Sequence, residues 1–107
     1  MPFSERVSSG VFNNVTPVTI VPSPSSGAYV VKSIIIHNAD TANVTVTVRV
    51  VDGGNNRSII YTTLAPGDTL YLSDTIVLES SQSIQGLLAG TVTTNQPTFV
   101  ASYGEST

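Results

Sequence analysis

The sequence predicts an all-β fold, a single antiparallel β-sandwich or jelly roll of about seven to eight short strands. The first observation is residues 43–50, where valine alternates with threonine and arginine without interruption. Such alternation buries one face of a strand and leaves the other in water. The second is that 15 Val, 8 Ile and 14 Thr make about a third of the chain β-branched, which favours strands over helices. The third is that turn signals recur at roughly ten-residue intervals, as in sandwiches.

The first half of the chain predicts two strands before the alternating one. Residues 11–21 form a strand pattern interrupted by Pro17, which indicates an edge position or a bulge. Residues 22–27 are rich in proline, serine and glycine and predict a turn. Residues 28–38 follow as a strand whose centre, Ile34-Ile35-Ile36, is apolar on both faces. This pattern predicts either a strand covered on both sides or one whose outer face lies in a subunit contact.

The second half predicts a hairpin and several short strands. Residues 52–56, Asp-Gly-Gly-Asn-Asn, favour a hairpin turn because Gly and Asn accept positive φ. Residues 57–63 are the expected return strand. Residues 64–68, Leu-Ala-Pro-Gly-Asp, predict a type II turn with Pro at its second position and Gly at its third. The remaining expected strands are 69–72, 75–78, 83–89 and 98–103.

The chain of 107 residues predicts one domain. Residues 1–10 are polar and serine-rich, which predicts an N-terminal arm ahead of a β-sandwich domain at 11–107. The arm either reaches a neighbouring subunit or packs on its own domain. The N-terminus has no apolar stretch of signal-peptide length, and no run approaches the roughly 18 apolar residues of a membrane span. We therefore expect synthesis in the cytoplasm and no membrane partner.

Charge is scarce. Only 10% of residues are Asp, Glu, Lys or Arg, against about 25% in an average soluble domain. Charge protects exposed strand edges from unwanted pairing, so either the sandwich closes its edges or an assembly covers them; we favour the assembly. The net charge is −3, and the four basic residues are dispersed. Without a basic patch, direct binding of nucleic acid is not expected.

The sequence offers no set of catalytic residues. His37 is the sole histidine, there is no cysteine, and neither a G-x-S-x-G elbow nor a glycine-rich phosphate loop occurs. Asp68 and Asp74 fall in turns, where aspartates usually bond their own backbone. We therefore expect no enzymatic activity, no cofactor, no metal site and no small-molecule ligand.

A carbohydrate-binding adhesin module is the alternative from another class. Four tyrosines are available to form a sugar-stacking platform: Tyr29, Tyr61, Tyr71 and Tyr103. Tyrosine is equally common in strands and in protein interfaces.

Three segments resemble a pattern in small virion proteins of tailed bacteriophages. They are Val30-Val31-Lys32-Ser33-Ile34-Ile35-Ile36-His37-Asn38, then Val44-Thr45-Val46-Thr47-Val48, then Leu64-Ala65-Pro66-Gly67-Asp68-Thr69-Leu70. A late segment, Val77 to Ile84, continues the likeness, which covers about residues 28–103. Similar sequence motifs occur in capsid decoration, neck and tail-associated proteins. The resemblance implies a β-sandwich or jelly-roll body that adds to a particle without enzymatic activity.

The leading hypothesis is a bacteriophage virion structural protein, a capsid decoration (cement) protein that stabilises the head through subunit contacts. Neck or tail-associated roles remain as the nearest alternatives. The expected partners are the major capsid protein or other virion subunits and further copies of this chain, and the expected location is the virion. Apolar strand faces and exposed edges would make the contacts, with the arm reaching a neighbour. The residues assigned to partner contacts are Phe3, Arg6, Phe12, Ile34, Ile36 and Tyr103.

Overall fold

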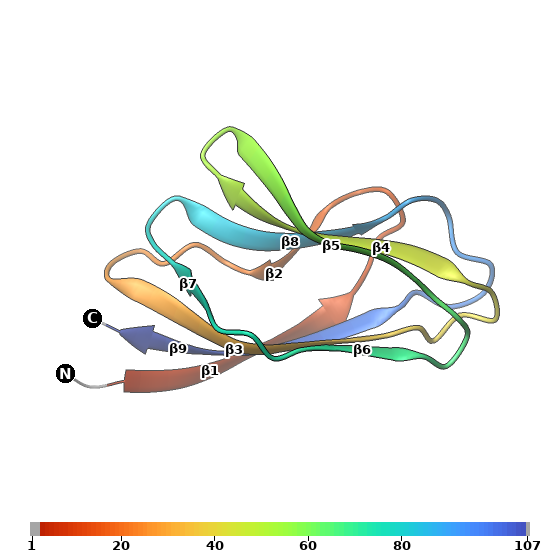
Figure 1. The fold of residues 1–107 in the computed structure, drawn as a ribbon, viewed down its shortest axis with the longest axis horizontal. Helices are drawn as coiled ribbons and strands as arrows, with labels where there is room; N and C mark the ends of the chain where they lie inside the picture. Colours follow the sequence, from red (N-terminus) through yellow and green to blue (C-terminus); the bar gives the residue numbers. More distant parts are fainter. Residues whose placement is uncertain (1–2, 107) are drawn as a thin grey trace.

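The chain folds as two antiparallel sheets packed face to face, which confirms the predicted β-sandwich. A computed structural model describes residues 3–106, with side chains from residue 4 to residue 105. Figure 1 shows the two layers edge-on, with Phe3 and Ser106, the first and last described residues, paired at one end of the lower layer. Within the described residues there are nine strands: β1 Phe3–Val11, β2 Val18–Val21, β3 Ala28–His37, β4 Val44–Asp52, β5 Asn55–Leu64, β6 Thr69–Leu72, β7 Ile76–Leu78, β8 Gln82–Leu88 and β9 Thr98–Ser106.

The larger sheet contains five strands in the order β1-β9-β3-β6, and β7 pairs with β3 farther along the same edge as β6. The smaller sheet has the order β2-β8-β4-β5. All pairs are antiparallel. Strands distant in sequence therefore lie side by side, as β1 and β9 do along their whole length.

Residues 3–21 depart from the expected pattern, whereas the strands expected at 28–38 and 43–50 are present as β3 and β4. The single strand expected over 11–21 is divided, because β1 ends at Val11 and β2 begins at Val18. Between them the chain turns at Asn14, which has a φ of 51°. Residues 3–10, most of the expected arm, belong to β1 and pair with β9 of the same chain; residues 1–2 lie outside the described range. A contact between this segment and a neighbouring subunit stays a prediction.

The turns predicted at 52–56 and 64–68 are present. Gly53, in the turn between β4 and β5, has a φ of 63°, a backbone conformation that residues with a Cβ rarely adopt. Gly67 has a φ of 83°, and the Asp68 N–H donates to the Ala65 carbonyl oxygen at 3.0 Å. These values match the type II turn that Pro66-Gly67 predicted.

The core lies between the sheets and is made by alternate residues of the paired strands. Val44, Val46 and Val48 point inward from β4, as the alternating pattern predicted. Facing them, Ile34 and Ile36 of β3 are each 1% exposed. Among the described residues, the buried side chains of the core cluster are Phe12, Ile20, Val21, Tyr29, Val31, Ile34, Ile36, Val44, Val46, Val48, Leu64, Leu78, Ile84, Leu88, Phe99, Ala101 and Tyr103.

Phe12 fills the core at the point where β1 ends. Its ring is fully buried and meets the Phe99 ring edge-on, with centroids 5.7 Å apart. Gly86 of β8 makes room for it: a Cβ at Gly86 would overlap the Phe12 ring and approach Ile20 Cδ1 to 2.8 Å. The Phe12 ring therefore occupies the space that Gly86 leaves by having no side chain, and this contact attaches the end of β1 to the smaller sheet.

Asn38 and Asp40 organise the loops at one end of the sandwich. The Asn38 side chain is fully buried, donates to the carbonyl oxygens of Ala42 and Leu64, both at 3.0 Å, and accepts the Asp40 N–H at 2.9 Å. The Asp40 carboxylate accepts three backbone N–H groups of the 93–95 loop, at distances of 2.7 to 3.1 Å. A loop with no strand of its own is thus held by one carboxylate.

The Asp40 contacts predict loss of stability in acid. Backbone N–H donors, that of Thr93 first, lower the pKa of Asp40 from 3.8 to about 2. Because the folded-state pKa is lower than the unfolded one, this stabilisation is complete above pH 3.8 and is lost as the pH falls towards 2. Thermal unfolding of wild type and Asp40→Asn across this range should show a Tm gap of about 5 °C or more at neutral pH that narrows in acid. A gap that stays constant with pH would contradict the assignment.

Candidate assembly interface

The outward-facing side of the larger sheet, called here the outer face, is apolar although no layer covers it among residues 3–106. Strand register defines its members, because residues paired across antiparallel strands point to the same side. Ile36 and Phe99 are paired and buried, so the next pair, Ile35 and Val100, points outward. Tyr71 continues the row from β6. The apolar residues of the outer face are Val7, Val11, Val30, Ile35, Tyr71, Val77 and Val100.

Several of these side chains are mostly in water. Val7 is 69% exposed, Tyr71 70%, Val77 56% and Val100 41%. Val7, Val11, Tyr71, Val77 and Val100 are five of the eight large apolar residues exposed in the described chain. An exposed apolar patch spread over all five strands of one sheet is typical of an interaction surface.

The charges of the outer face cancel. Glu5 of β1 and Lys32 of β3 form an ion pair at 2.7 Å, and the hydrogen bond from Lys32 lowers the pKa of Glu5. His37, at the other end of β3, lies 2.9 Å from the Thr69 hydroxyl. The exposed ion pair between Glu5 and Lys32 adds little to stability. The face therefore presents apolar and neutral polar groups, without a net charge that would repel a partner.

Strand β1 contributes almost nothing to the core. From Ser4 to Val11 every side chain is exposed except Ser8, which is half-buried. The strand is held by its pairing with β9 and by the Arg6–Glu105 ion pair at 2.6 Å, which raises the pKa of Arg6. Backbone pairing without buried side chains makes β1 a typical exposed edge strand.

The residues assigned to partner contacts from sequence do not gather on one surface. Ile34, Ile36 and Phe12 are buried between the sheets, and Tyr103 is 7% exposed, with its ring 4.9 Å from that of Tyr29. Arg6 is half-exposed beside Glu105, and the side chain of Phe3 lies outside the described residues. Contact of any of the six with a partner stays a prediction.

Sequence reasoning missed most of the outer face. The signal was present in part, because Ile35 stands in the doubly apolar centre of β3, for which an outer subunit contact was one expectation. Val7 and Val11 lie in a segment without regular apolar alternation, and Tyr71 and Val77 belong to short separate strands. Only the register places these residues on the same face as Ile35 and Val100.

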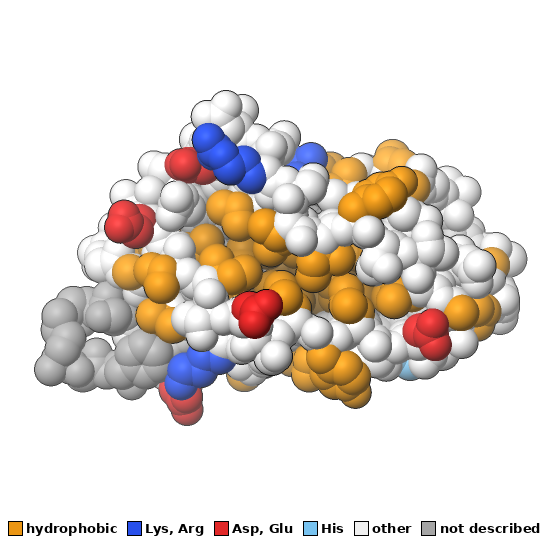
Figure 2. Space-filling model, in the orientation of Figure 1, with side chains coloured by type: hydrophobic (Ala, Val, Ile, Leu, Met, Phe, Trp, Pro, Cys, Tyr) orange, Lys and Arg blue, Asp and Glu red, His pale blue; other side chains and the backbone are white. Residues whose placement is uncertain are grey.

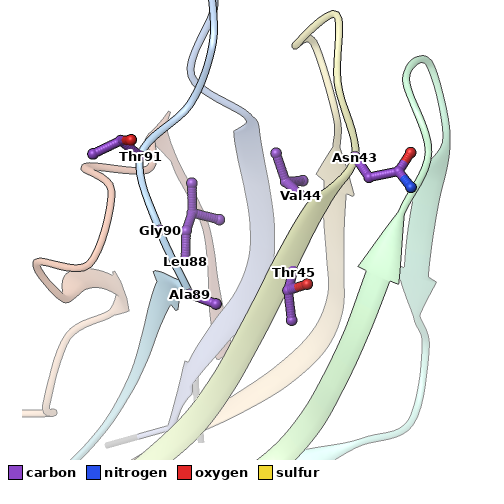
Figure 3. Close-up of a pocket in the computed structure, with 7 residues that line it drawn as sticks. All are labelled: Asn43, Val44, Thr45, Leu88, Ala89, Gly90 and Thr91. Carbon is purple, nitrogen blue, oxygen red and sulfur yellow. The ribbon is translucent and has the colours of Figure 1, made fainter.

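The structure also contains a pocket where β4 and β8 diverge (Figure 3). It has a volume of about 290 Å³ and is lined by Asn43, Val44, Thr45, Leu88, Ala89, Gly90 and Thr91. None of these side chains ionises, and none is a strong nucleophile. Among residues 3–106 no cluster of three or more His, Asp or Glu side chains is positioned to hold a metal ion.

The tyrosines do not form a single platform. Tyr29 and Tyr103 are buried, Tyr71 lies on the outer face of the larger sheet, and Tyr61 projects from the opposite sheet, where it is 73% exposed. The two exposed rings therefore face opposite sides of the sandwich, which does not favour a stacked sugar site. Within residues 3–106 there is no helix long and apolar enough to cross a bilayer.

Comparison with known proteins shows the fold alone. No protein-family model and no curated protein matches the sequence. Among solved structures, a protein of Bacillus endospore appendages, described as a novel family of disulfide-linked pili, has a TM-score of 0.54 at 13% identity, covering 98% of this chain and 87% of that one. This chain has no cysteine, so it cannot form disulfide links.

Two viral structures are more distant. A chain of the cyanophage Pam1 capsid asymmetric unit has a TM-score of 0.48 at 14% identity, covering 97% of this chain and 82% of that one. A chain of infectious bursal disease virus, Gx strain, has a TM-score of 0.44 at 9% identity, covering 95% of this chain and 31% of that one.

Proposed function

We propose that this protein is a non-enzymatic structural subunit of a bacteriophage virion, a capsid decoration (cement) protein that binds the major capsid protein through its outer face. The uncovered apolar outer face is the observation that carries the proposal, because a soluble domain rarely leaves such a patch without a partner. The strand and turn motifs at 30–38, 44–48 and 64–70, which resemble those of tailed-phage virion proteins, supply the choice of particle.

The physical mechanism is burial of a flat sheet surface. Five strands about 4.8 Å apart and roughly 30 Å long present several hundred Å², comparable to the ~800 Å² per partner of a standard interface. The near absence of charge keeps the desolvation cost low, since few ionised groups lose water. Bridging adjacent capsid subunits with such a surface resists their separation.

The first test is the composition of purified particles. Quantitative mass spectrometry of particles from the native source should find the protein in fixed proportion to the major capsid protein. Separation of heads from tails before analysis decides between decoration and a neck or tail position. Absence from particles, or a trace amount that varies between preparations, would overturn the virion role.

A matched pair of variants tests the binding face. Val100→Lys places a charge at the centre of the outer face, whereas Ile59→Lys places it on the other sheet; the two wild-type side chains are 41% and 42% exposed. In a sedimentation assay with particles that lack the protein, Val100→Lys should weaken attachment at least tenfold, a loss of about 1.4 kcal/mol. Ile59→Lys should bind as wild type does. Equal binding by both variants would remove the outer face from the mechanism.

A further inference from the structure

The larger sheet ends in two open edges that match in direction. Among the described residues β1 pairs only with β9, while β6 and β7 pair only with β3. Because every neighbouring pair is antiparallel, β1 runs opposite to β6 and β7. A second copy placed alongside in the same orientation brings its β1 antiparallel to β6 and β7 of the first. We propose that the protein self-associates through this edge, with β1 of one copy pairing with β6 and β7 of the next.

The two edges also match in length. Ser9, Val100, Ile35 and Tyr71 occupy one row across β1, β9, β3 and β6. Farther along, Arg6 of β1 shares a row with Ile76 of β7. The short strands together share seven of the nine rows of β1, all except those of Phe3 and Val7, so β1 of a second copy finds backbone partners along both.

Incomplete cover at the receiving edge is the second observation. Leu70 and Leu72 of β6 and Ile76 of β7 point towards the core but are only partly buried. Figure 2 shows hydrophobic side chains open to solvent between the two layers, on the side where β5, β6 and β7 form the edges in Figure 1. A strand added there covers this seam, and two of the β1 residues on the core-facing side, Ser8 and Gly10, are small enough to lie against it.

Charge favours a β1 strand over an arbitrary one at this edge. Residues 65–80 carry Asp68, Asp74 and Glu79 and no Lys or Arg. Arg6 of β1 keeps 52% of its side chain exposed beside Glu105. In the row-matched pairing, Arg6 of the second copy lies opposite Ile76 and two residues along the chain from Asp74. Pairing of two β1 strands with each other leaves Leu70 and Leu72 uncovered.

This contact is head-to-tail, so repetition gives a ring or a filament according to the rotation between copies. It merges the larger sheets of neighbouring copies and leaves all outer faces on one side, available for a particle surface. The inference goes beyond the proposed virion role and does not depend on it, because the edges exist in the isolated protein.

A cysteine-free chain permits a clean crosslinking test. In the double variant Ser9→Cys with Tyr71→Cys, the row-matched pairing places the two Cα atoms at about 5 Å, within disulfide range. Inside one chain the same positions are separated by β9 and β3, roughly 14 Å, too far for a bond. Mild oxidation of the purified protein should give a ladder of dimers, trimers and larger species on a non-reducing gel, which collapses on reduction.

The control is the double variant Ser9→Cys with Thr47→Cys, whose second cysteine lies on the opposite sheet; it should give no ladder. Sedimentation velocity of the wild-type protein should show a mass that rises with concentration. A wild-type monomer at every concentration, together with no ladder, overturns the proposal. The single variant Ser9→Cys gives a further check. If its oxidation yields as much crosslinked dimer as the double variant with Tyr71→Cys, the proposal is also overturned, because that result means that β1 pairs with β1. Virion incorporation has no bearing on either outcome.

Discussion

Phe12→Ala is expected to lower the free energy of unfolding by about 3–5 kcal/mol, the cost of removing a fully buried aromatic ring and leaving a cavity. The Phe12 ring packs edge-on against Phe99 and lies against Gly86, which Ile20 also approaches. The sheets on either side cannot close around the cavity that the substitution leaves. Urea unfolding should show a lower midpoint with an unchanged slope.

Val15→Ala is the control for this change. Val15 belongs to the same connection between β1 and β2 but is 55% exposed, so its truncation should change stability by about 0.5 kcal/mol or less. A loss below about 1 kcal/mol for Phe12→Ala would mean that the ring is not enclosed as described.

Asn38→Ala is expected to cost about 3 kcal/mol. The substitution removes both donors to the carbonyl oxygens of Ala42 and Leu64 and the acceptor for the Asp40 N–H, and each buried group left unsatisfied costs about 1–3 kcal/mol, only partly relieved by water. Thermal and urea unfolding measure the loss.

Two companion variants separate the Asn38 hydrogen bonds from side-chain removal in general. Asn56→Ala, at an exposed position on β5, should be nearly neutral. Asn38→Asp keeps an acceptor for the Asp40 N–H but directs a negative charge at two carbonyl oxygens, so at neutral pH it should be at least as unstable as Asn38→Ala. Near-wild-type stability of Asn38→Asp would show that the two donated bonds contribute little.

The strands were largely predictable because their pattern is local. Alternation over 44–50 gives both the strand and its buried face, and the inward positions of Val44, Val46 and Val48 follow from it. Turn chemistry is equally local: Gly53 and Gly67 adopt the positive φ values that their turns require. These features depend on a few neighbouring residues, which any reader of the sequence has in view.

The N-terminal strand was not predicted because its pattern is weak. Residues 4–10 are mostly polar and contribute no fully buried side chain, so no apolar alternation marks them. Pairing with β9, about a hundred residues away, makes the segment a strand. Phe12 was seen as an apolar anchor for a partner, but its burial beside Gly86 and Phe99 depends on three strands that the chain brings together only on folding.

The candidate interface was also predictable only in part from the sequence. The apolar centre Ile34-Ile35-Ile36 indicated two covered faces, and the fold assigned the first and third residues to the core and the second to the outer face. Val7, Tyr71 and Val77 join Ile35 only through register, which sequence does not reveal when the strands come from separate hairpins.

By itself the sequence determined an all-β sandwich of low charge, with its turns and most of its strands, because side-chain alternation and turn chemistry are properties of short segments. The tertiary structure alone decided which apolar residues are covered, which edges stay open and which loop Asp40 holds. Those outcomes depend on pairings between residues tens of positions apart. In a β-sandwich such pairings decide which of the two faces of each strand becomes surface.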